Sequence, residues 1–210
     1  MSERAFTDYL DRIGDRTALY AAVAAHTGAR RVLYPGSYLD LAPSYVWADV
    51  TYLDADARAA RAFAGPDATT LARRHRRPPG QPLITFVPGD YTDTLSGLPA
   101  AAWDLALSLY AGPVSEHAKR CLRPGGWILA NNSHADAGLA HLDPDYRLAA
   151  VIHHRSGRYL LTTDHLDQYL RPRRPPHPTR DQLHTAGRGA AYARPALAYL
   201  FRFRHEPGAR

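Results

Sequence analysis

The feature that most constrains the fold of this chain is a series of five short apolar runs separated by longer segments of mixed polarity. The runs fall at residues 31–35, 50–54, 83–87, 104–109 and 127–131. Each run is apolar along most of its length, which is typical of strands buried on both faces of a parallel sheet. Helical segments between such strands indicate βαβ units. The sequence therefore predicts an α/β fold with a doubly wound, mostly parallel sheet.

The segments between and after these strands carry their own signals. Residues 17–26 are rich in alanine with apolar side chains at helical spacing, and Gly28 supplies a stop. Residues 146–154 and 157–163 flank Arg155-Ser156-Gly157 and predict a hairpin. Further elements are expected as helices over 44–49, 55–64, part of 67–82, 114–122 and 163–170, a long loop over 171–194, and a last strand over 196–203.

Composition limits the class of protein. A chain of 210 residues, 45% hydrophobic and 22% charged, is suited to one globular domain. The single cysteine, Cys121, excludes an intramolecular disulfide and fits a reducing compartment. The N-terminus lacks the apolar core of a signal peptide, and no run approaches the length of a membrane span. We therefore expect a cytoplasmic protein with no membrane partner.

The charge of the chain is positive but does not by itself indicate a polyanion partner. The formal net charge is +6, and nearly all the positive side chains are arginine because Lys119 is the only lysine. The arginine clusters at 73–77 and 171–174 lie beside prolines and lack the interleaved aromatic residues of single-strand binders. We therefore do not expect nucleic acid as a partner. No HExxH or Cys-His ligand spacing occurs, so no metal is expected.

Polar residues follow the apolar runs at the points where each strand is expected to end. Gly36 follows the first strand, Asp54 closes the second 18 residues later, and Asp90 and Ser108 follow or close the third and fourth. Ligands of doubly wound sheets bind at this edge, and an acid about 20 residues after the first turn binds a ribose diol. An acid at the end of a strand can instead cap the next helix.

At these residues the chain resembles the class I S-adenosylmethionine-dependent methyltransferases. The resemblance covers about 30–132: RVLYPGSY is similar to the family's glycine-rich first motif, VTYLDAD to its second strand, and FVPGDYTD to its Gly-Asp turn. WDLALSLYAGP and CLRPGGWILANN are similar to its fourth and fifth strands, and this is the most specific part. The resemblance implies a Rossmann-like fold with a seven-stranded sheet and an antiparallel C-terminal strand.

The resemblance also implies a cofactor, S-adenosyl-L-methionine, and a set of residues that bind it. Asp54 would bind the ribose, Asp90 the adenine amino group and Tyr91 the adenine ring. The implied cofactor-binding residues are Tyr34, Gly36, Ser37, Tyr38, Asp54, Asp90, Tyr91 and Ser108.

The first motif departs from the family pattern. Tyr34 stands where the family commonly has an acid, and Tyr38 and Asp40 stand where it has glycines. These bulky side chains are expected to reshape the pocket beside the methionine part of the ligand. The two tyrosines could offer aromatic faces to a sulfonium, at about 0.5–2 kcal/mol each.

Two residues are candidates for catalysis. His134 lies in the polar segment NNSHADAG after the fifth strand, could act as a base, and has Asp136 nearby as a partner. The alternative is a capping role for this segment, with Asn132 or Ser133 as the N-cap and Asp136 in the first turn. Tyr110 follows the fourth strand, where family members often contact the acceptor; it could equally be a packed rim residue.

These observations predict a single domain in which residues 1–29 form a helical lid on the S-adenosylmethionine-binding part, 30–210. The expected function is methyl transfer to a small molecule, because no nucleic-acid-binding module is recognisable. Other sulfonium chemistry, such as aminopropyl transfer or cyclisation, stays open. So do a non-catalytic ligand-binding or scaffold protein that keeps the fold, an RNA methyltransferase, and assembly as a homodimer.

Overall fold

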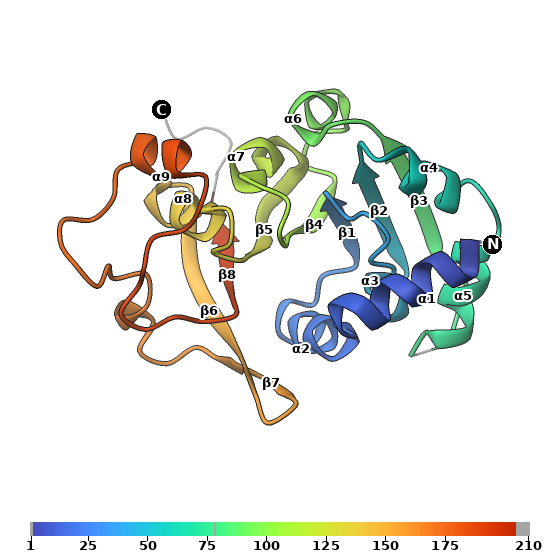
Figure 1. The fold of residues 1–210 in the computed structure, drawn as a ribbon, viewed down its shortest axis with the longest axis horizontal. Helices are drawn as coiled ribbons and strands as arrows, with labels where there is room; N and C mark the ends of the chain where they lie inside the picture. The colour runs from blue at the N-terminus through green and yellow to red at the C-terminus, as the bar shows by residue number, and fades with distance from the viewer. Residues whose placement is uncertain (1, 78, 205–210) are drawn as a thin grey trace.

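The computed structural model describes residues 2–77 and 79–204, and its centre is one eight-stranded sheet (Figure 1). The strand order is β3-β2-β1-β4-β5-β8-β6-β7. The strands are β1 Arg31–Pro35, β2 Asp49–Asp54, β3 Leu83–Pro88, β4 Trp103–Ser108, β5 Leu122–Ala130, β6 Tyr146–Arg155, β7 Arg158–Thr162 and β8 Ala198–Phe203.

Strand directions confirm a mostly parallel sheet with antiparallel strands from the C-terminal part of the chain. Strands β1 to β5 pair in parallel, and β8 inserts between β5 and β6, antiparallel to both. The order reverses between β1 and β4, as in doubly wound folds. The described residues form eight strands rather than the expected seven, because β7 folds back on β6 from Arg158 and extends the sheet.

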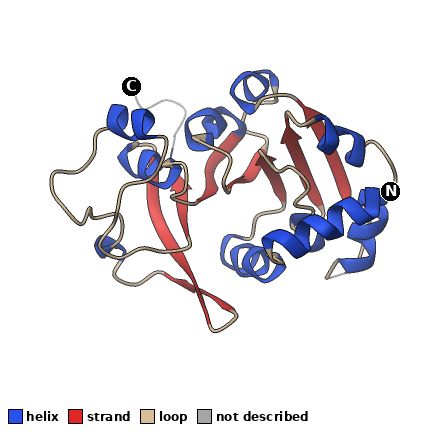
Figure 2. Ribbon diagram, viewed as in Figure 1, coloured by secondary structure: helices blue, strands red, loops and turns tan. Residues whose placement is uncertain are grey.

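Helices cover both faces of the sheet (Figure 2). One face is packed by helices from the first part of the chain: α1 Ser2–Ile13, α2 Thr17–Thr27, α3 Pro43–Val46, α4 Ala57–Phe63 and α5 Asp67–His75. The later elements are α6 Tyr91–Thr94, η1 Leu95–Gly97, α7 Val114–Ala118, η2 Lys119–Cys121, α8 Asp136–Leu142, η3 Leu166–Gln168 and α9 Arg180–Ala186. Of these, α7 and α8 pack the opposite face.

The apolar character of the central strands follows from this layering. In β1, Val32 and Tyr34 belong to the core beneath α1 to α5, whereas Leu33 between them belongs to the core beneath α7 and α8. All three are at most 1% exposed. Burying a leucine or valine side chain contributes about 1.5–3 kcal/mol, so both faces favour an apolar residue at every position. β3, at the sheet edge, is only partly buried.

Three expected elements differ from the structure. The segment expected as one helix over 114–122 forms the shorter helices α7 and η2 and stops before Leu122. Leu122 pairs with Trp103 of β4 and is the first residue of β5, which is longer than expected. The helix expected over 163–170 is only the short η3. The loop expected over 171–194 contains α9, whose N-terminus is a capping box in which Thr179 and Gln182 each accept from the other's backbone N–H.

Candidate functional site

Asp54 lies where the resemblance places the ribose ligand, at the end of β2. Its Oδ2 accepts the backbone N–H of Tyr38 at 2.7 Å, and its Oδ1 accepts that of Asp56 at 2.8 Å. Each carboxylate oxygen has a further lone pair, and the side chain is half-buried. The carboxylate therefore joins the turn after β1 to the turn after β2 and keeps acceptor capacity.

Asp90 and Tyr91 follow β3 at the same edge. Asp90 is exposed and caps α6 by accepting the backbone N–H and the hydroxyl of Thr92 at 2.9 and 2.8 Å, which lowers the pKa of the carboxyl. Tyr91 is half-buried, and burial raises its pKa to about 12. Its hydroxyl lies against Gly112, where an added Cβ would be 2.4 Å from the oxygen. Tyr91 therefore bridges α6 and the loop after β4.

The turn after β1 is held closely against its neighbours. Gly36 has φ +66°, donates its N–H to Leu53 O at 2.7 Å, and faces Ala111, whose Cβ lies 2.2 Å from an ideal Cβ built on the glycine. The loops after β1 and β4 are thus in direct contact. Ser37, the next residue, is buried, and its hydroxyl has no hydrogen-bond partner within the described chain.

Tyr38 occupies a left-handed conformation with φ +44°, at a position where the family pattern has glycine. Such a backbone costs roughly 1–2 kcal/mol for a residue with a side chain. The hydrogen bond from its N–H to Asp54 holds the conformation, and its ring lies 5.0 Å from the ring of Tyr9 and 5.4 Å from the Arg58 guanidinium carbon. Its ring is thus already in contact with α1 and α4.

The other changed positions of the first motif form a buried polar cluster. Asp40 is 0% exposed, and its carboxylate accepts from the Tyr20 hydroxyl at 2.7 Å, the Tyr34 hydroxyl at 3.2 Å, the Ala42 N–H at 3.2 Å and Arg16 at 3.4 Å. Burial raises the pKa of Asp40. The ring of Tyr34 is 1% exposed, so the expected aromatic face toward a ligand is not present there.

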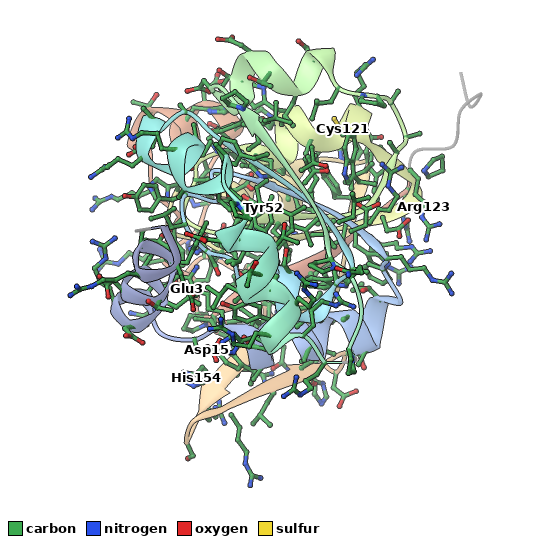
Figure 3. All side chains as sticks on the ribbon, turned by 90° about the vertical axis from the view of Figure 1, so that its right-hand side faces the viewer. Glu3, Asp15, Tyr52, Cys121, Arg123 and His154 are labelled. Carbon is green, nitrogen blue, oxygen red and sulfur yellow. The ribbon has the colours of Figure 1, made fainter. Side chains whose placement is uncertain are left out.

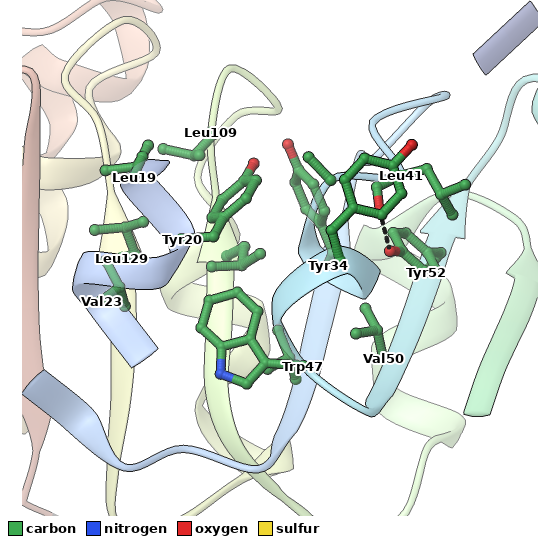
Figure 4. Packing of buried hydrophobic residues seen from close by; sticks show 14 of the residues in the cluster. Leu19, Tyr20, Val23, Tyr34, Leu41, Trp47, Val50, Tyr52, Leu109 and Leu129 are labelled. Atoms are coloured by element: carbon green, nitrogen blue, oxygen red, sulfur yellow. Dashed lines mark hydrogen bonds between the residues drawn. The ribbon is translucent and has the colours of Figure 1, made fainter. Parts of the chain in front are cut away.

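Figure 4 shows the packing around this cluster. Tyr20 on α2 lies beside Trp47, with ring centroids 5.8 Å apart, and Tyr52 donates its hydroxyl to Leu41 O at 3.3 Å. The Ser44 hydroxyl lies 2.6 Å from the same Tyr52 oxygen. The segment after β1 is therefore fixed by side-chain hydrogen bonds to α2 and β2, where the family pattern has flexible glycines.

Ser108 closes β4 and is bound to protein rather than open to a ligand. It donates its hydroxyl to Asp136, which also accepts from the hydroxyl of Ser115 and from the Ser115 N–H at 3.1 Å. Asp136 is 1% exposed, and burial raises its pKa to about 6. It lies in the first turn of α8, as expected, but the N-cap is Ala135 rather than Asn132 or Ser133.

His134 is exposed, and Asp136 does not act as its partner, because Ser108 and Ser115 surround that carboxylate. Instead the Ser133 hydroxyl lies 2.9 Å from His134 Nδ1 and donates to Asn131 Oδ1 at 2.8 Å. The Ser133 hydroxyl therefore connects His134 to Asn131 rather than to Asp136. Its catalytic role stays a prediction.

A cavity of about 470 Å³ opens at the carboxyl ends of β4 and β5. The catalytic candidate Tyr110 is 50% exposed and lines this cavity. The other candidate, His134, is not among the described residues that line it. The sequence interpretation missed most of its polar wall, which consists of Asp15, Arg16, Asn131, His154 and Tyr159. Figure 3 shows Asp15 and His154 at the same end of the molecule, although 139 residues separate them in sequence.

These residues fit the nucleoside part of S-adenosylmethionine better than its methionine part. Asp54 can accept from ribose hydroxyls, Asp90 is exposed, and the orphaned hydroxyl of Ser37 is a donor without a partner in the described chain. At the methionine end, the contact between Gly36 and Ala111 leaves less room than a turn of three glycines would. Asp15 and Arg16 are the acidic and basic side chains that line the neighbouring cavity.

The fold of this chain is similar to that of several solved structures. No protein-family model matches the chain, and no curated protein matches it in sequence. Among solved structures, cofactor-bound Rv0187 from MTB is similar at 17% identity over 97% of this chain and 88% of that one, with a TM-score of 0.57. An O-methyltransferase from Bacillus cereus in complex with SAH is similar at 14% identity over 76% and 87%, with a TM-score of 0.52.

A third structure is TomG from Streptomyces achromogenes, an O-methyltransferase involved in tomaymycin synthesis, in complex with SAM. It is similar at 12% identity over 77% of this chain and 86% of that chain, with a TM-score of 0.53. Taken with the strand order, these likenesses show that the chain has the fold of the class I S-adenosylmethionine-dependent methyltransferases. Among the described helices, none is both long and apolar enough to cross a membrane.

Proposed function

We propose that this protein transfers a methyl group from S-adenosylmethionine to a small molecule bound in the cavity at the ends of β4 and β5. The observation that carries the proposal is the position of this cavity at the carboxyl ends of β4 and β5, the strands that follow β2 and β1 in the sheet order. Asp54 ends β2, and Ser37 follows the end of β1. Ligands of doubly wound sheets bind at this edge, on both sides of the point where the strand order reverses. The similar O-methyltransferases, two of them in complex with SAM or SAH, support it.

In this proposal the chain holds and orients its ligands. Asp54 accepts from the ribose, Ser37 donates to the cofactor, and Asp90 and Tyr91 face the adenine. The cofactor supplies a methyl group on a good leaving group, so alignment of the acceptor accounts for much of the rate. A base is needed when the acceptor loses a proton, and His154 in the cavity wall and His134 beyond Asn131 are the two candidates.

A second candidate function is binding of a ligand without methyl transfer. The contact of Gly36 with Ala111 and the buried Tyr34 favour it, because both fill space that an open first motif would leave to the methionine part. In that case the cavity would bind its ligand, and S-adenosylmethionine would not bind at the ends of β1 to β3.

A melting curve with S-adenosylmethionine, S-adenosylhomocysteine and NAD tests the proposal. At 100 times its dissociation constant a ligand stabilises the fold by about 2.7 kcal/mol, which is roughly 5–10 °C for a chain of this length. We expect this shift with the first two ligands and none with NAD. Asp54→Ala should abolish it through loss of the ribose contact. An absent shift at millimolar ligand would favour the second candidate.

A further inference from the structure

The cavity beside β4 and β5 is built from segments that are distant in sequence. Residues from the end of α1, the α1–α2 linker and the start of α2 form one side, and Leu109, Tyr110 and Asn131 at the ends of β4 and β5 form the floor. The β6–β7 hairpin supplies His154, Gly157 and Tyr159, and Leu197 and Ala198, just before and at the start of β8, complete the lining. Its volume of about 470 Å³ is within the range of small-molecule sites.

Aromatic faces surround the opening. Tyr110 is 50% exposed, and its backbone is left-handed with φ +67°. His154 and Tyr159 form a stacked pair across the hairpin, with ring centroids 4.5 Å apart and an interplanar angle of 19°. Such surfaces favour a flat ring, which can be stacked or packed edge to face.

Arg16 supplies directed hydrogen-bond donors to the same space. Its side chain is only 15% exposed and is held by the ion pair with Asp40 at 3.4 Å and by the ring of Tyr110, 4.9 Å from the guanidinium carbon. Within the described chain, only Asp40 accepts a hydrogen bond from this side chain, so most of the five N–H donors of a guanidinium are available. A planar carboxylate matches such a fork.

The charges around Arg16 disfavour a ligand with two negative charges. Asp40, in contact with the guanidinium, balances its charge, and Asp15 lines the cavity as a second carboxylate. Asp15 lies at the exposed rim, where its Oδ1 accepts from the N–H and the hydroxyl of Thr17 at 2.7 and 2.6 Å. A dianion such as phosphate would be repelled by both carboxylates more strongly than a monoanion.

We propose that this cavity binds an aromatic carboxylate, with its carboxylate on Arg16 and its ring against Tyr110 and the His154–Tyr159 pair. The inference names the acceptor class of the proposed methyl transfer and in that sense rests on it. A hydroxyl on the ring would lie among Asn131 and His154, where the imidazole can hold the proton that the hydroxyl loses. The acceptor is therefore a hydroxylated aromatic acid.

Calorimetric titration of the full chain with 4-hydroxybenzoate, without S-adenosylmethionine, tests the inference. We expect binding of 4-hydroxybenzoate and at least tenfold weaker binding of the uncharged 4-hydroxybenzamide and of the non-aromatic cyclohexanecarboxylate. Arg16→Gln should weaken 4-hydroxybenzoate about tenfold. Arg12→Gln is the matched control, since Arg12 also lies over a tyrosine ring, Tyr9 at 5.0 Å, but outside the cavity lining; it should bind like wild type.

A second variant protects the test against misfolding, because Arg16→Gln leaves Asp40 without its cation. Tyr110→Ala changes an exposed side chain and should weaken 4-hydroxybenzoate while the melting temperature stays close to that of wild type. Equal binding of acid and amide, or equal binding by wild type and both variants, would overturn the inference. Binding of 4-hydroxybenzoate without any cofactor shift would leave it standing and contradict the proposed methyl transfer; the reverse result would contradict the inference alone.

Discussion

At the scale of single residues, burial decides the chemistry of the acidic side chains. Asp90 is exposed and keeps a low pKa through its hydrogen bonds to Thr92, whereas burial raises the pKa of Asp136 from 3.8 to about 6. The hydrogen bonds from Ser108 and Ser115 oppose this rise without cancelling it. The two carboxyls therefore respond in opposite ways to acid.

The raised pKa of Asp136 predicts a pH-dependent contribution to stability. Between about pH 4 and pH 6 the folded chain binds a proton on Asp136 that the unfolded chain has released. The free energy of unfolding contributed by this group is therefore present below pH 4 and lost as pH rises through 6, by on the order of 3 kcal/mol. Urea unfolding at pH 4, 5, 6 and 7 measures it.

Two variants isolate this contribution from other carboxyls. Asp136→Asn cannot titrate, so its stability relative to wild type should improve as pH rises from 4 to 7. Asp164→Asn, at an exposed position, serves as control and should follow wild type at every pH. A constant difference between Asp136→Asn and wild type across the range would contradict the assignment.

At the scale of elements, Gly36 in the turn after β1 and Gly28 at the end of α2 differ in how closely other atoms pack around them. Gly36 and Gly28 have nearly the same φ, +66° and +63°, but an added Cβ on Gly28 meets nothing within 4 Å, whereas on Gly36 it meets Ala111 at 2.2 Å. Both positions carry the backbone cost of a left-handed alanine, roughly 1–2 kcal/mol. Only the alanine substitution at Gly36 adds a steric clash to this cost.

We therefore expect Gly36→Ala to destabilise the fold by roughly 1–3 kcal/mol more than Gly28→Ala. Chemical denaturation of both variants at one pH measures the difference. Equal losses would mean that the loops after β1 and β4 move apart without cost. That result would also support a proposed cofactor site with room for the methionine part, because the contact between Gly36 and Ala111 narrows that site.

Elements with strong local signals were predicted from the sequence, and weaker ones were not. The strands over 31–35, 50–54 and 83–87 match β1, β2 and β3 within one residue at each end. For β1 and β2 the reason is burial on both faces of the sheet, which favours apolar side chains. Helix α9 was missed although Thr179 and Gln182 carry its capping signal, since the prolines and glycines nearby favour a loop.

At the scale of the whole molecule, one continuous sheet joins the N-terminal helices to the C-terminal strands. Phe6, Tyr20 and Val23 of α1 and α2 are 0% exposed and share a core with Ala198 and Leu200 of β8. Helices α1 and α2 thus contribute side chains to the main core. Residues 13–16 also line the cavity. A role of residues 1–29 as a lid stays a prediction, and so does assembly as a homodimer.

A shared core predicts one cooperative unfolding transition. Far-ultraviolet circular dichroism follows all helices and strands. Tryptophan fluorescence follows Trp47 and Trp127 in the core beneath α1 to α5 and Trp103 in the core beneath α7 and α8. We expect the two signals to give the same midpoint in urea. Separate midpoints would show that residues 1–29 or the β6–β8 part unfolds independently.

The positions of the five parallel strands and the placement of Asp54 and Asp90 at one edge of the sheet follow from the amino-acid sequence. These features depend on local periodicity and on short spacings, which the chain carries directly. Only the tertiary structure decided that Tyr34 and Asp40 form a buried cluster with Arg16, and that Arg16 faces a cavity with His154. Arg16 and His154 are 138 positions apart in the sequence, and no local pattern encodes which distant side chains will share a cluster or a cavity.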